Sequence, residues 1–363
     1  MRLLLAGGGT GGHLFPAVAL AQLLLKQDEK SAVLFVGTKR GLEQRLLPGL
    51  GLRLATVDMV GVVGRGWRGK VEIGPKIAKS LIQAKIIMRN FKPDLVIGVG
   101  GYASVPVLLI AKMTGVPYLI HEQNAIPGLS NRLLGRWAKK ICLSFTGSGS
   151  AFDRNKTLVT GNPLRQGLET VAAKIPPRGK LLIFGGSRGA HAINQAVLKI
   201  LPFLHDWDER PEILHQTGED DFLQVQQGYR DAGFDPEQVV PFIDDMATAY
   251  AEASLVICRA GATTLAELAA CGRAAILIPF PYAAGDHQTA NGKALESAGA
   301  AISVPQSELI PETLAVLVRN LWGDQQTLQS MADQGRKLGF PGAAERILNE
   351  CRSLLGNPSV EVK

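Results

Sequence analysis

Short apolar runs alternate with longer amphipathic segments along most of the chain. The runs carry no polar alternation, which is typical of strands buried on both faces of a parallel sheet. We predict strands at Leu3–Ala6, Ala32–Gly37, Leu52–Val57, Asp94–Val99, Pro117–Ile120, Lys140–Ser144, Leu181–Phe184, Glu212–Gln216, Val239–Pro241, Ser254–Cys258 and Ala274–Pro279. We predict helices at Leu14–Leu25, Gly41–Leu47, Pro75–Asn90, Val105–Thr114, Leu129–Lys140, Ala192–Leu201, within Asp220–Ala232, at Ala262–Cys271 and from Pro311 onward. This order predicts an α/β protein.

A strand–loop–helix pattern occurs twice in the chain. Leu3–His13 aligns without gaps to Leu181–His191, and each copy is an apolar strand, a glycine loop and the start of a helix. Each copy therefore predicts the first strand of its own doubly wound, Rossmann-like domain. We expect domains at 1–165 and 178–340 facing each other across a cleft, with a linker at Ala172–Lys180. A C-terminal helix at about 340–357 is expected to pack back on the first domain.

The stretch from Ser254 to Gly272 has the pattern of a nucleotide site. An apolar strand breaks at Arg259-Ala-Gly261, and a helix follows, so backbone N–H groups and a helix dipole would face a phosphate. Glu267 lies where a carboxylate can reach ribose hydroxyls, and the polar loop Asp286–Asn291 follows the next strand. The pattern indicates a nucleotide-sugar site. The alternative is an ordinary strand–helix–strand unit with an exposed Glu.

The first glycine loop allows a second interpretation. Gly7–Gly12 fits G-x-G-x-x-G, which also occurs in dinucleotide-binding domains. Such a domain should carry an acid at the end of its second strand, but that strand ends in Gly37-Thr-Lys-Arg40. The basic pair would suit a 2′-phosphate, so a redox enzyme stays an alternative. The second copy of the loop, at 185–191, is not expected of a simple dehydrogenase.

Two side chains beside the glycine loops are candidates for chemistry. His13 follows the first loop, where a helix N-terminus disfavours the imidazolium, so it either accepts a proton or caps the helix. Ser187, in the second loop, is placed to donate its hydroxyl to a phosphate oxygen.

Composition and charge narrow the class of protein. The 363 residues favour two domains, and the net charge of +7 favours an anionic partner. Nucleic acid is not expected, because the basic residues are scattered and aromatics make up 6%. The four cysteines have no CxxC spacing and indicate free thiols in a reducing compartment.

Membrane and metal signals are weak. The N-terminal apolar run is too short for a signal peptide, and the glycines in Leu95–Ala111 favour a strand, a loop and a helix over a membrane span. We expect a cytoplasmic protein. Asp206-Trp-Asp208 has D-x-D spacing but lies in a polar turn away from the glycine loops, so we expect no metal site. Helix Pro75–Asn90 is either a core helix with a solvated basic face or a basic amphipathic surface for anionic lipid.

Together these motifs resemble the MurG family of bacterial cell-wall N-acetylglucosaminyltransferases. The resemblance covers nearly the whole chain. It rests on Gly7–Pro16, Gly100-Gly-Tyr102, His121-Glu-Gln-Asn124, Gly161-Asn-Pro-Leu-Arg165, Gly185-Gly-Ser187, Phe242-Ile-Asp-Asp-Met246, Arg259–Glu267 and Asp286-His-Gln288. Two positions depart from the family pattern: Ala260 replaces the usual Ser and Arg188 a common Gln.

The resemblance implies the two-domain GT-B fold and an inverting, metal-independent transfer without a cofactor. The donor would be UDP-N-acetylglucosamine, and the acceptor the 4-hydroxyl of an undecaprenyl-diphosphate-linked muramyl-pentapeptide. The enzyme would lie peripherally on an anionic membrane surface, at the cytoplasmic face of the inner membrane. Two alternatives stay open: a soluble GT-B transferase with a small-molecule acceptor, and a nucleotide-sugar sensor without turnover.

The resemblance also implies roles for single residues. His13 by preference, or Glu122, would be the catalytic base. Ile243 would meet the uracil and Glu267 the ribose, while Asn124 and Gln288 would meet the sugar. The donor set is completed by Thr10, Gly11, Gly12, Arg165, Ser187, Ala262, Thr263, Thr264, Leu265 and Ala266. The acceptor diphosphate would lie on Gly8, Gly9, Gly100, Gly101 and Tyr102.

Overall fold

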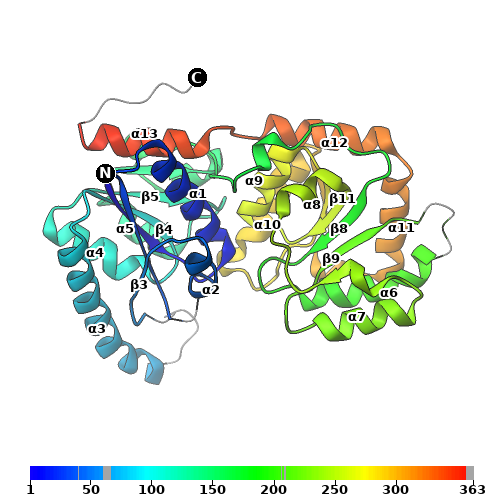
Figure 1. Ribbon diagram of the computed structural model, residues 1–363, viewed down its shortest axis with the longest axis horizontal. Helices are drawn as coiled ribbons and strands as arrows, with labels where there is room; N and C mark the ends of the chain where they lie inside the picture. Colours follow the sequence, from blue (N-terminus) through cyan, green and yellow to red (C-terminus); the bar gives the residue numbers. More distant parts are fainter. Residues whose placement is uncertain (40, 60–66, 206, 208–209, 357–363) are drawn as a thin grey trace. The chain divides into compact units, whose positions relative to one another are not determined.

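Two parallel sheets organise the chain, one in each of two units (Figure 1). The structure, a computed structural model, describes residues 1–39, 41–59, 67–205, 207 and 210–356, and of residues 67–73 only the backbone. Unit 1 comprises Met1–Arg165 and Gly342–Lys363, and unit 2 comprises Gln166–Pro341. The predicted α/β class, with two Rossmann-like domains, is confirmed.

Unit 1 has a seven-stranded sheet in the order β3-β2-β1-β4-β5-β6-β7, with every pair parallel. Its strands are β1 (Arg2–Gly7), β2 (Ala32–Gly37), β3 (Leu54–Thr56), β4 (Leu95–Gly100), β5 (Tyr118–Glu122), β6 (Lys140–Leu143) and β7 (Thr157–Val159). Its helices are α1 (Gly11–Gln27), α2 (Glu43–Gly49), α3 (Trp67–Phe91), α4 (Ser104–Thr114), α5 (Leu129–Gly135) and α13 (Ala343–Leu354). The strand order reverses between β1 and β4, the place where Rossmann-like sheets bind ligands.

Alternate residues of β1 enter two different cores. Leu3 and Leu5 pack with α1 and α13, whereas Leu4 and Ala6 pack with α3, α4 and α5 on the opposite face. Because successive side chains of a strand point to opposite faces, a central strand covered on both sides must be apolar throughout. This explains the uninterrupted apolar run at the start of the chain.

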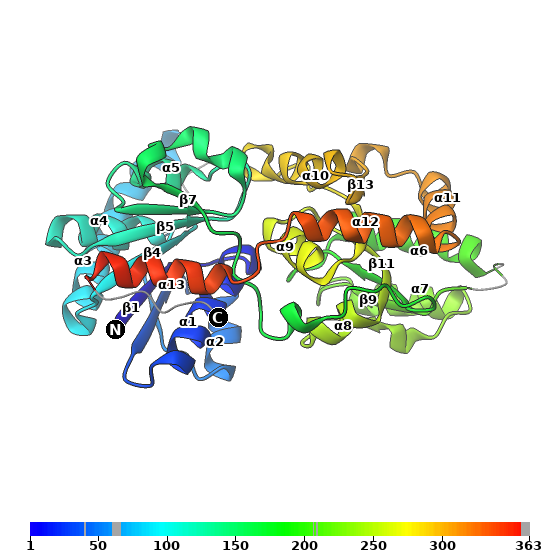
Figure 2. The same ribbon diagram turned by 90° about the horizontal axis from the view of Figure 1, so that it is seen from above.

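The last helix, α13, lies along α1 on one face of the unit 1 sheet (Figures 1 and 2). Ile347, Leu348 and Cys351 are fully buried in the core shared with α1. Arg346 adds two hydrogen bonds, from Nε and Nη2 to the Thr160 carbonyl oxygen, at 3.1 and 2.9 Å. The C-terminal segment therefore completes the core that the N-terminal strand begins.

Unit 2 has a six-stranded sheet in the order β10-β9-β8-β11-β12-β13, again all parallel. Its strands are β8 (Lys180–Phe184), β9 (Ile213–Gln216), β10 (Val239–Val240), β11 (Ala253–Cys258), β12 (Ala274–Leu277) and β13 (Ala301–Ser303). Its helices are α6 (His191–His205), α7 (Phe222–Asp231), α8 (Met246–Glu252), α9 (Ala262–Cys271), α10 (His287–Ser297), α11 (Pro311–Trp322) and α12 (Gln325–Lys337). The order reverses between β8 and β11, at the same place in the pattern as in unit 1.

The segment predicted as a linker is built into unit 2. Ile175 is fully buried in its core, and its backbone N–H donates to Gln329 Oε1 at 3.0 Å. Ser254 ties down the following residues, accepting from the Gly179 N–H and donating to the Pro176 carbonyl oxygen. The Pro-Pro pair misled the sequence-based prediction because prolines are typical of free linkers as well as of extended segments packed on a core.

Helices α1 and α3 begin well before their predicted starts at Leu14 and Pro75. Helix α1 begins at Gly11 and α3 at Trp67, so Pro16 and Pro75 lie inside helices. Proline favours the first helical turn, which is why the sequence indicated Pro75 as a start. No helix among the described residues is long and apolar enough to cross a bilayer, and Leu95–Ala111 divides into β4 and α4, as expected.

Arg273 is a buried arginine that should contribute strongly to the stability of unit 2. It is 2% exposed and donates to the carbonyl oxygens of Tyr250, Ala251, Cys271, Gly272 and Ala172. We predict that Arg273→Met lowers the free energy of unfolding by more than about 2 kcal/mol, since each orphaned buried acceptor costs roughly 1–3 kcal/mol. Urea unfolding followed by circular dichroism measures this.

Arg230→Met is the matched control. Arg230 is exposed on α7, where it donates to the side-chain oxygens of Gln226 and Gln227, so its loss should change stability by less than about 0.5 kcal/mol. Equal stability of the two variants would show that the carbonyl groups do not depend on Arg273.

Candidate functional site

Two glycine loops meet at the carboxyl end of the unit 1 sheet. One follows β1 and the other follows β4, and their backbones touch: a side chain at Gly7 would overlap the Gly100 carbonyl oxygen, and one at Gly101 would lie 2.8 Å from the Gly8 oxygen. Gly7 also has a φ of 144°, a value that residues with a side chain rarely adopt. The predicted residues Gly8, Gly9, Thr10, Gly11, Gly12, Gly100 and Gly101 are thus brought together, and Tyr102 beside them is 40% exposed.

Glu43 holds the first glycine loop in place, although no motif in the sequence singles it out. This fully buried carboxylate accepts from the Gly9 N–H at 2.9 Å, from the Thr38 N–H at 2.7 Å and from the Thr38 hydroxyl at 3.1 Å. Side chains at Gly8, Gly37 or Gly41 would collide with it. An acid therefore does lie at the end of the second strand, supplied from α2, but it binds the loop itself instead of presenting its oxygens to a ribose.

His13, in the first turn of α1, is half-buried beside Gly100. Its Nδ1 lies 3.1 Å from Oε1 of Gln123, the residue that follows β5. A side chain at Gly100 would approach the imidazole to 3.0 Å, so this glycine leaves room for the ring. The contact with Gln123 shows that Nδ1 is directed at the end of β5 and not at the backbone of α1, as a helix cap would be.

Glu122 is buried and its carboxylate is surrounded by donors. One oxygen accepts from the N–H and the side-chain amide of Asn124, at 3.0 and 3.2 Å. The other accepts from the Gly128 N–H at 3.0 Å and from Asn131 Nδ2 at 2.8 Å. Glu122 therefore folds the loop 122–128 and fixes Asn124, which makes it a poor candidate for a base that must approach a substrate.

Arg165 closes unit 1 and stacks its guanidinium 4.3 Å above the ring of Phe15 in α1. It therefore lies near the helix that carries His13. The remaining predicted residues lie in unit 2. They are Ser187, Ile243, Ala262, Thr263, Thr264, Leu265, Ala266, Glu267 and Gln288.

The second glycine loop, Gly185–Ala190, is held by the end of β9. Gln216 donates to the Gly186 carbonyl oxygen at 2.8 Å and accepts from the Ile243 N–H at 3.4 Å. This 3% exposed side chain thus joins the loop that carries Ser187 to the segment that carries Ile243. No motif in the sequence singles out Gln216, because its partners are backbone groups far along the chain.

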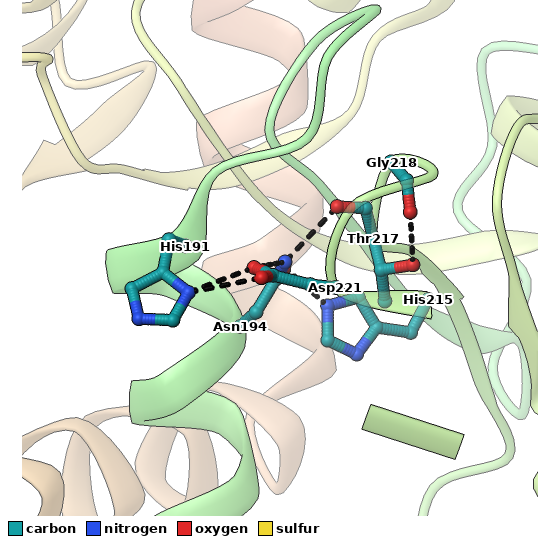
Figure 3. Close-up of polar contacts among 6 residues, drawn as sticks. All are labelled: His191, Asn194, His215, Thr217, Gly218 and Asp221. Carbon is teal, nitrogen blue, oxygen red and sulfur yellow. Dashed lines mark hydrogen bonds and ion pairs between the residues drawn. The ribbon is translucent and has the colours of Figure 1, made fainter. Parts of the chain in front are cut away.

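A polar network lies beneath the same loop (Figure 3). His191 Nδ1 lies 3.0 Å from both carboxylate oxygens of Asp221, and Asn194 Nδ2 donates to Asp221 and to the Thr217 carbonyl oxygen at 2.7 and 3.0 Å. Asn194 Oδ1 in turn lies 3.1 Å from Nε2 of the buried His215. Burial lowers the pKa of His215 to about 3, so this ring is neutral.

Helix α9 presents its N-terminus as the sequence predicts, but the two charged residues near it are oriented inward. Glu267 is 1% exposed and accepts from the Tyr250 hydroxyl at 3.1 Å. Arg259 donates to the carbonyl oxygens of Ile278 and Pro279 and to Gln306, and burial lowers its pKa to about 10. The Arg259 side chain therefore anchors the chain after β12.

The other donor candidates differ in burial. Ala262, Thr263 and Leu265 are buried, whereas Ser187, Thr264 and Ala266 are half-buried. Gln288 Oε1 accepts from the Phe280 N–H at 2.9 Å, which fixes the side chain at the start of α10. No cluster of three His, Cys, Asp or Glu residues able to hold a metal is found in the part of the chain that the structure describes. Asp206 and Asp208 of the D-x-D, and Arg40, lie outside that part.

Comparisons with known proteins cover almost the whole chain. Residues 3–143 match the glycosyltransferase family 28 N-terminal domain, and residues 180–347 match the glycosyltransferase family 28 C-terminal domain. Relatives from Syntrophotalea carbinolica and Syntrophus aciditrophicus are 56% and 47% identical, each over 98% of this chain and 99% of its own. Both bear the name UDP-N-acetylglucosamine–N-acetylmuramyl-(pentapeptide) pyrophosphoryl-undecaprenol N-acetylglucosamine transferase.

Comparisons with solved structures lead to the same family. A crystal structure of Acinetobacter baumannii MurG is 37% identical, covers 97% of this chain and 99% of its own, and superposes with a TM-score of 0.74. The UDP complex of S. aureus MnaA, at 14% identity and a TM-score of 0.68 over the full length of both chains, shares the fold alone. With matches of this extent, the chain belongs to the MurG family of glycosyltransferases, within glycosyltransferase family 28, and has the GT-B fold.

Proposed function

We propose that this chain transfers N-acetylglucosamine from UDP-N-acetylglucosamine to the 4-hydroxyl of an undecaprenyl-diphosphate-linked muramyl-pentapeptide, the step that makes lipid II for peptidoglycan. The observation that carries the proposal is 56% identity, over 98% of the chain, with a relative whose name states this reaction. A hexosyltransferase is also what the two family 28 domains indicate. The chemistry of each unit supports one half of the reaction.

The donor half belongs to unit 2. The N-terminus of α9 begins at Gly261, whose extended backbone exposes the first amides of the helix to an anion. Gln216 holds the Ile243 backbone beside the second glycine loop, which suits recognition of a uracil edge and a phosphate by one rigid surface. Tyr250 orients the Glu267 carboxylate, which would bind the ribose hydroxyls.

The acceptor half belongs to unit 1. The loops after β1 and β4 bring many backbone amides together, a composition that suits the acceptor diphosphate. The amide of Gly9 is already engaged by Glu43, so Gly9 contributes through the shape of the loop and not through this hydrogen bond. Asn124, fixed by Glu122, would serve the sugar of the donor.

The reaction is a single displacement. The imidazole of His13 takes the proton of the 4-hydroxyl as that oxygen attacks the anomeric carbon. The bond from this carbon to the diphosphate oxygen breaks, UDP leaves, and the configuration inverts to a β-1,4 link. A positioned base of this kind contributes roughly 10²–10⁴-fold. Helix amides and Arg165 stabilise the charge that develops on the departing diphosphate.

Membrane association is supported by the outer surface of unit 1. On α3, Ile82 and Ile86 are 62% and 53% exposed, and Lys76, Lys79, Lys85 and Arg89 are exposed on the same helix. Exposed isoleucines within a basic helix are typical of surfaces that lie on anionic lipid. This surface favours a lipid-linked acceptor over a soluble one and a peripheral position at the cytoplasmic face of the inner membrane. Residues 60–66 of the preceding loop lie outside the described part of the chain.

The proposal predicts that label from UDP-N-acetylglucosamine moves to a lipid-linked muramyl-pentapeptide when both are incubated with the protein. Transfer should persist in excess chelator, because helix dipoles and arginine supply the positive charge. Product analysis by mass spectrometry and by digestion with a β-specific glycosidase measures both identity and configuration. Transfer only to a soluble acceptor, or only release of free sugar, would contradict the proposed function.

Two substitutions should separate donor binding from catalysis. Glu267→Gln should weaken UDP-N-acetylglucosamine binding at least about tenfold, because hydrogen bonds to a charged group are worth roughly 1.5–3 kcal/mol. His13→Ala should lower kcat by about 10²–10⁴-fold with little change in donor affinity. Calorimetry measures the first effect, and steady-state kinetics the second. Glu312→Ala and His205→Ala, both at exposed positions, are the matched controls.

Negative charges introduced at the exposed isoleucines of α3 should release the protein from vesicles. We predict that the double variant Ile82→Glu, Ile86→Glu reduces co-sedimentation with vesicles containing anionic lipid, while activity on a short-chain acceptor in detergent is kept. Leu223→Glu is the control, since Leu223 is 75% exposed on α7 of unit 2. If both variants sedimented equally with the vesicles, α3 would not be part of the membrane-binding surface.

A further inference from the structure

A chain of four hydrogen bonds connects His13 to the core of unit 1. Gln123 lies at its centre, with Oε1 3.1 Å from His13 Nδ1 and Nε2 3.1 Å from His121 Nδ1. The amide Nε2 also donates to the Val99 carbonyl oxygen at 3.0 Å. On the far side, His121 Nε2 lies 3.3 Å from the Gly161 carbonyl oxygen. Both ends of the chain behind His13 are therefore backbone carbonyl groups.

These two carbonyl groups fix the position of every proton in this chain of hydrogen bonds. A carbonyl oxygen can only accept, so the atom of Gln123 that faces Val99 must be the NH₂ group. Its Oε1 then faces His13 and can only accept, which requires the proton of His13 to be on Nδ1. In the same way, Gly161 requires the proton of His121 to be on Nε2, and His121 Nδ1 accepts from Gln123.

We propose that Gln123 is the positioning residue that holds the catalytic imidazole of His13 in the Nδ1–H tautomer, so that the lone pair which accepts the acceptor's proton is on Nε2. The inference rests on the proposed function for the identity of the proton donor, while the tautomer itself rests on the hydrogen-bond chain alone. His121 is the second positioning residue, because it fixes the amide of Gln123.

The surroundings of His121 and Gln123 keep both imidazoles in these tautomers. His121 and Gln123 are 0% and 1% exposed, and burial lowers the pKa of His121 to about 4, so its ring stays neutral with one donor and one acceptor. Ser144 Oγ lies 3.3 Å from His121 Nε2 and shares that nitrogen with the Gly161 carbonyl. Gly100 leaves the space in which the His13 ring lies. The sequence His121-Glu-Gln-Asn124 thus places a loop-forming acid between two residues that act on His13.

The second copy of the repeat shows the alternative. His191, aligned with His13, bonds through Nδ1 to the carboxylate of Asp221, and its side chain is 67% exposed (Figure 3). A carboxylate orients an imidazole and also adds negative charge beside it, whereas an amide only orients it. A base that works next to an anionic acceptor gains from an amide partner, because no further negative charge then faces the diphosphate.

Nuclear magnetic resonance of the ligand-free protein tests the tautomer directly. Long-range ¹H–¹⁵N correlations at a pH where imidazoles are neutral distinguish the protonated ring nitrogen from the bare one. The chain has six histidines, and spectra of His13→Asn and His121→Asn assign the two of interest. We expect Nδ1–H for His13 and Nε2–H for His121. Nε2–H for His13 would overturn the proposal.

Kinetics of two Gln123 variants test the role. Gln123→Leu removes both functions of the amide and should lower kcat at least about tenfold, a part of the roughly 10²–10⁴-fold that a positioned base supplies, with an unchanged KM for the donor. Gln123→Glu keeps an acceptor for His13 Nδ1–H and should recover part of kcat. Gln329→Leu is the control, since Gln329 likewise accepts one hydrogen bond, from the Ile175 N–H, and donates to a carbonyl oxygen.

The outcomes separate the two proposals. The expected tautomers without any glycosyl transfer would contradict the proposed function and leave the hydrogen-bond chain intact. Transfer with Nε2–H at His13, or with Gln123→Leu as active as Gln329→Leu, would contradict the positioning role and leave the proposed function intact. Should Gln123→Leu fail to fold, as judged by circular dichroism, the spectrum of the unmodified protein still decides.

Discussion

Contact between backbones at the carboxyl end of each sheet is the constraint on which the candidate site depends. In unit 1 the loop after β1 lies against the end of β4, and in unit 2 Gly189 lies against the Thr217 carbonyl at the end of β9. At both places a single Cβ atom would overlap a main-chain oxygen, so only glycine fits. Because no side chain intervenes, amides of neighbouring loops come close enough together to face one anion.

The residues of a glycine loop do not fix its conformation, because glycine has no side chain that could pack or form hydrogen bonds. Buried polar side chains from neighbouring elements do so. Glu43 binds the Gly9 amide in unit 1, and Gln216 binds the Gly186 carbonyl and the Ile243 amide in unit 2. These groups are costly to bury unless they are bonded, and here the bonds are made to the loop backbone itself. The shape of the proposed anion-binding surface is therefore set by residues that lie behind it.

The sequence predicts the fold well because the fold depends on local patterns. Apolar runs, glycine loops and the duplicated strand–loop–helix unit were enough to identify two parallel sheets, and the resemblance drew on motifs that lie next to those loops. What it missed are contacts between distant side chains and backbone. Glu43 is 34 positions from Gly9, and Gln123 is 110 positions from His13. Neither separation leaves a spacing signal. Arg259 shows the converse, since a basic residue beside a proposed phosphate loop is turned toward carbonyl groups.

The two copies of the repeat also place a histidine in two different environments. Both place a histidine at the start of the helix after a glycine loop, so the backbone alone does not distinguish them. The distinction comes from the segment that follows another strand of the same sheet. That segment supplies the amide of Gln123 after β5 in unit 1 and the carboxylate of Asp221 after β9 in unit 2. A half-buried ring held by an amide keeps a fixed tautomer without added charge, whereas an exposed ring held by a carboxylate lacks that isolation. The proposed difference in role between the two histidines therefore corresponds to a different hydrogen-bond partner in each unit, Gln123 for His13 and Asp221 for His191.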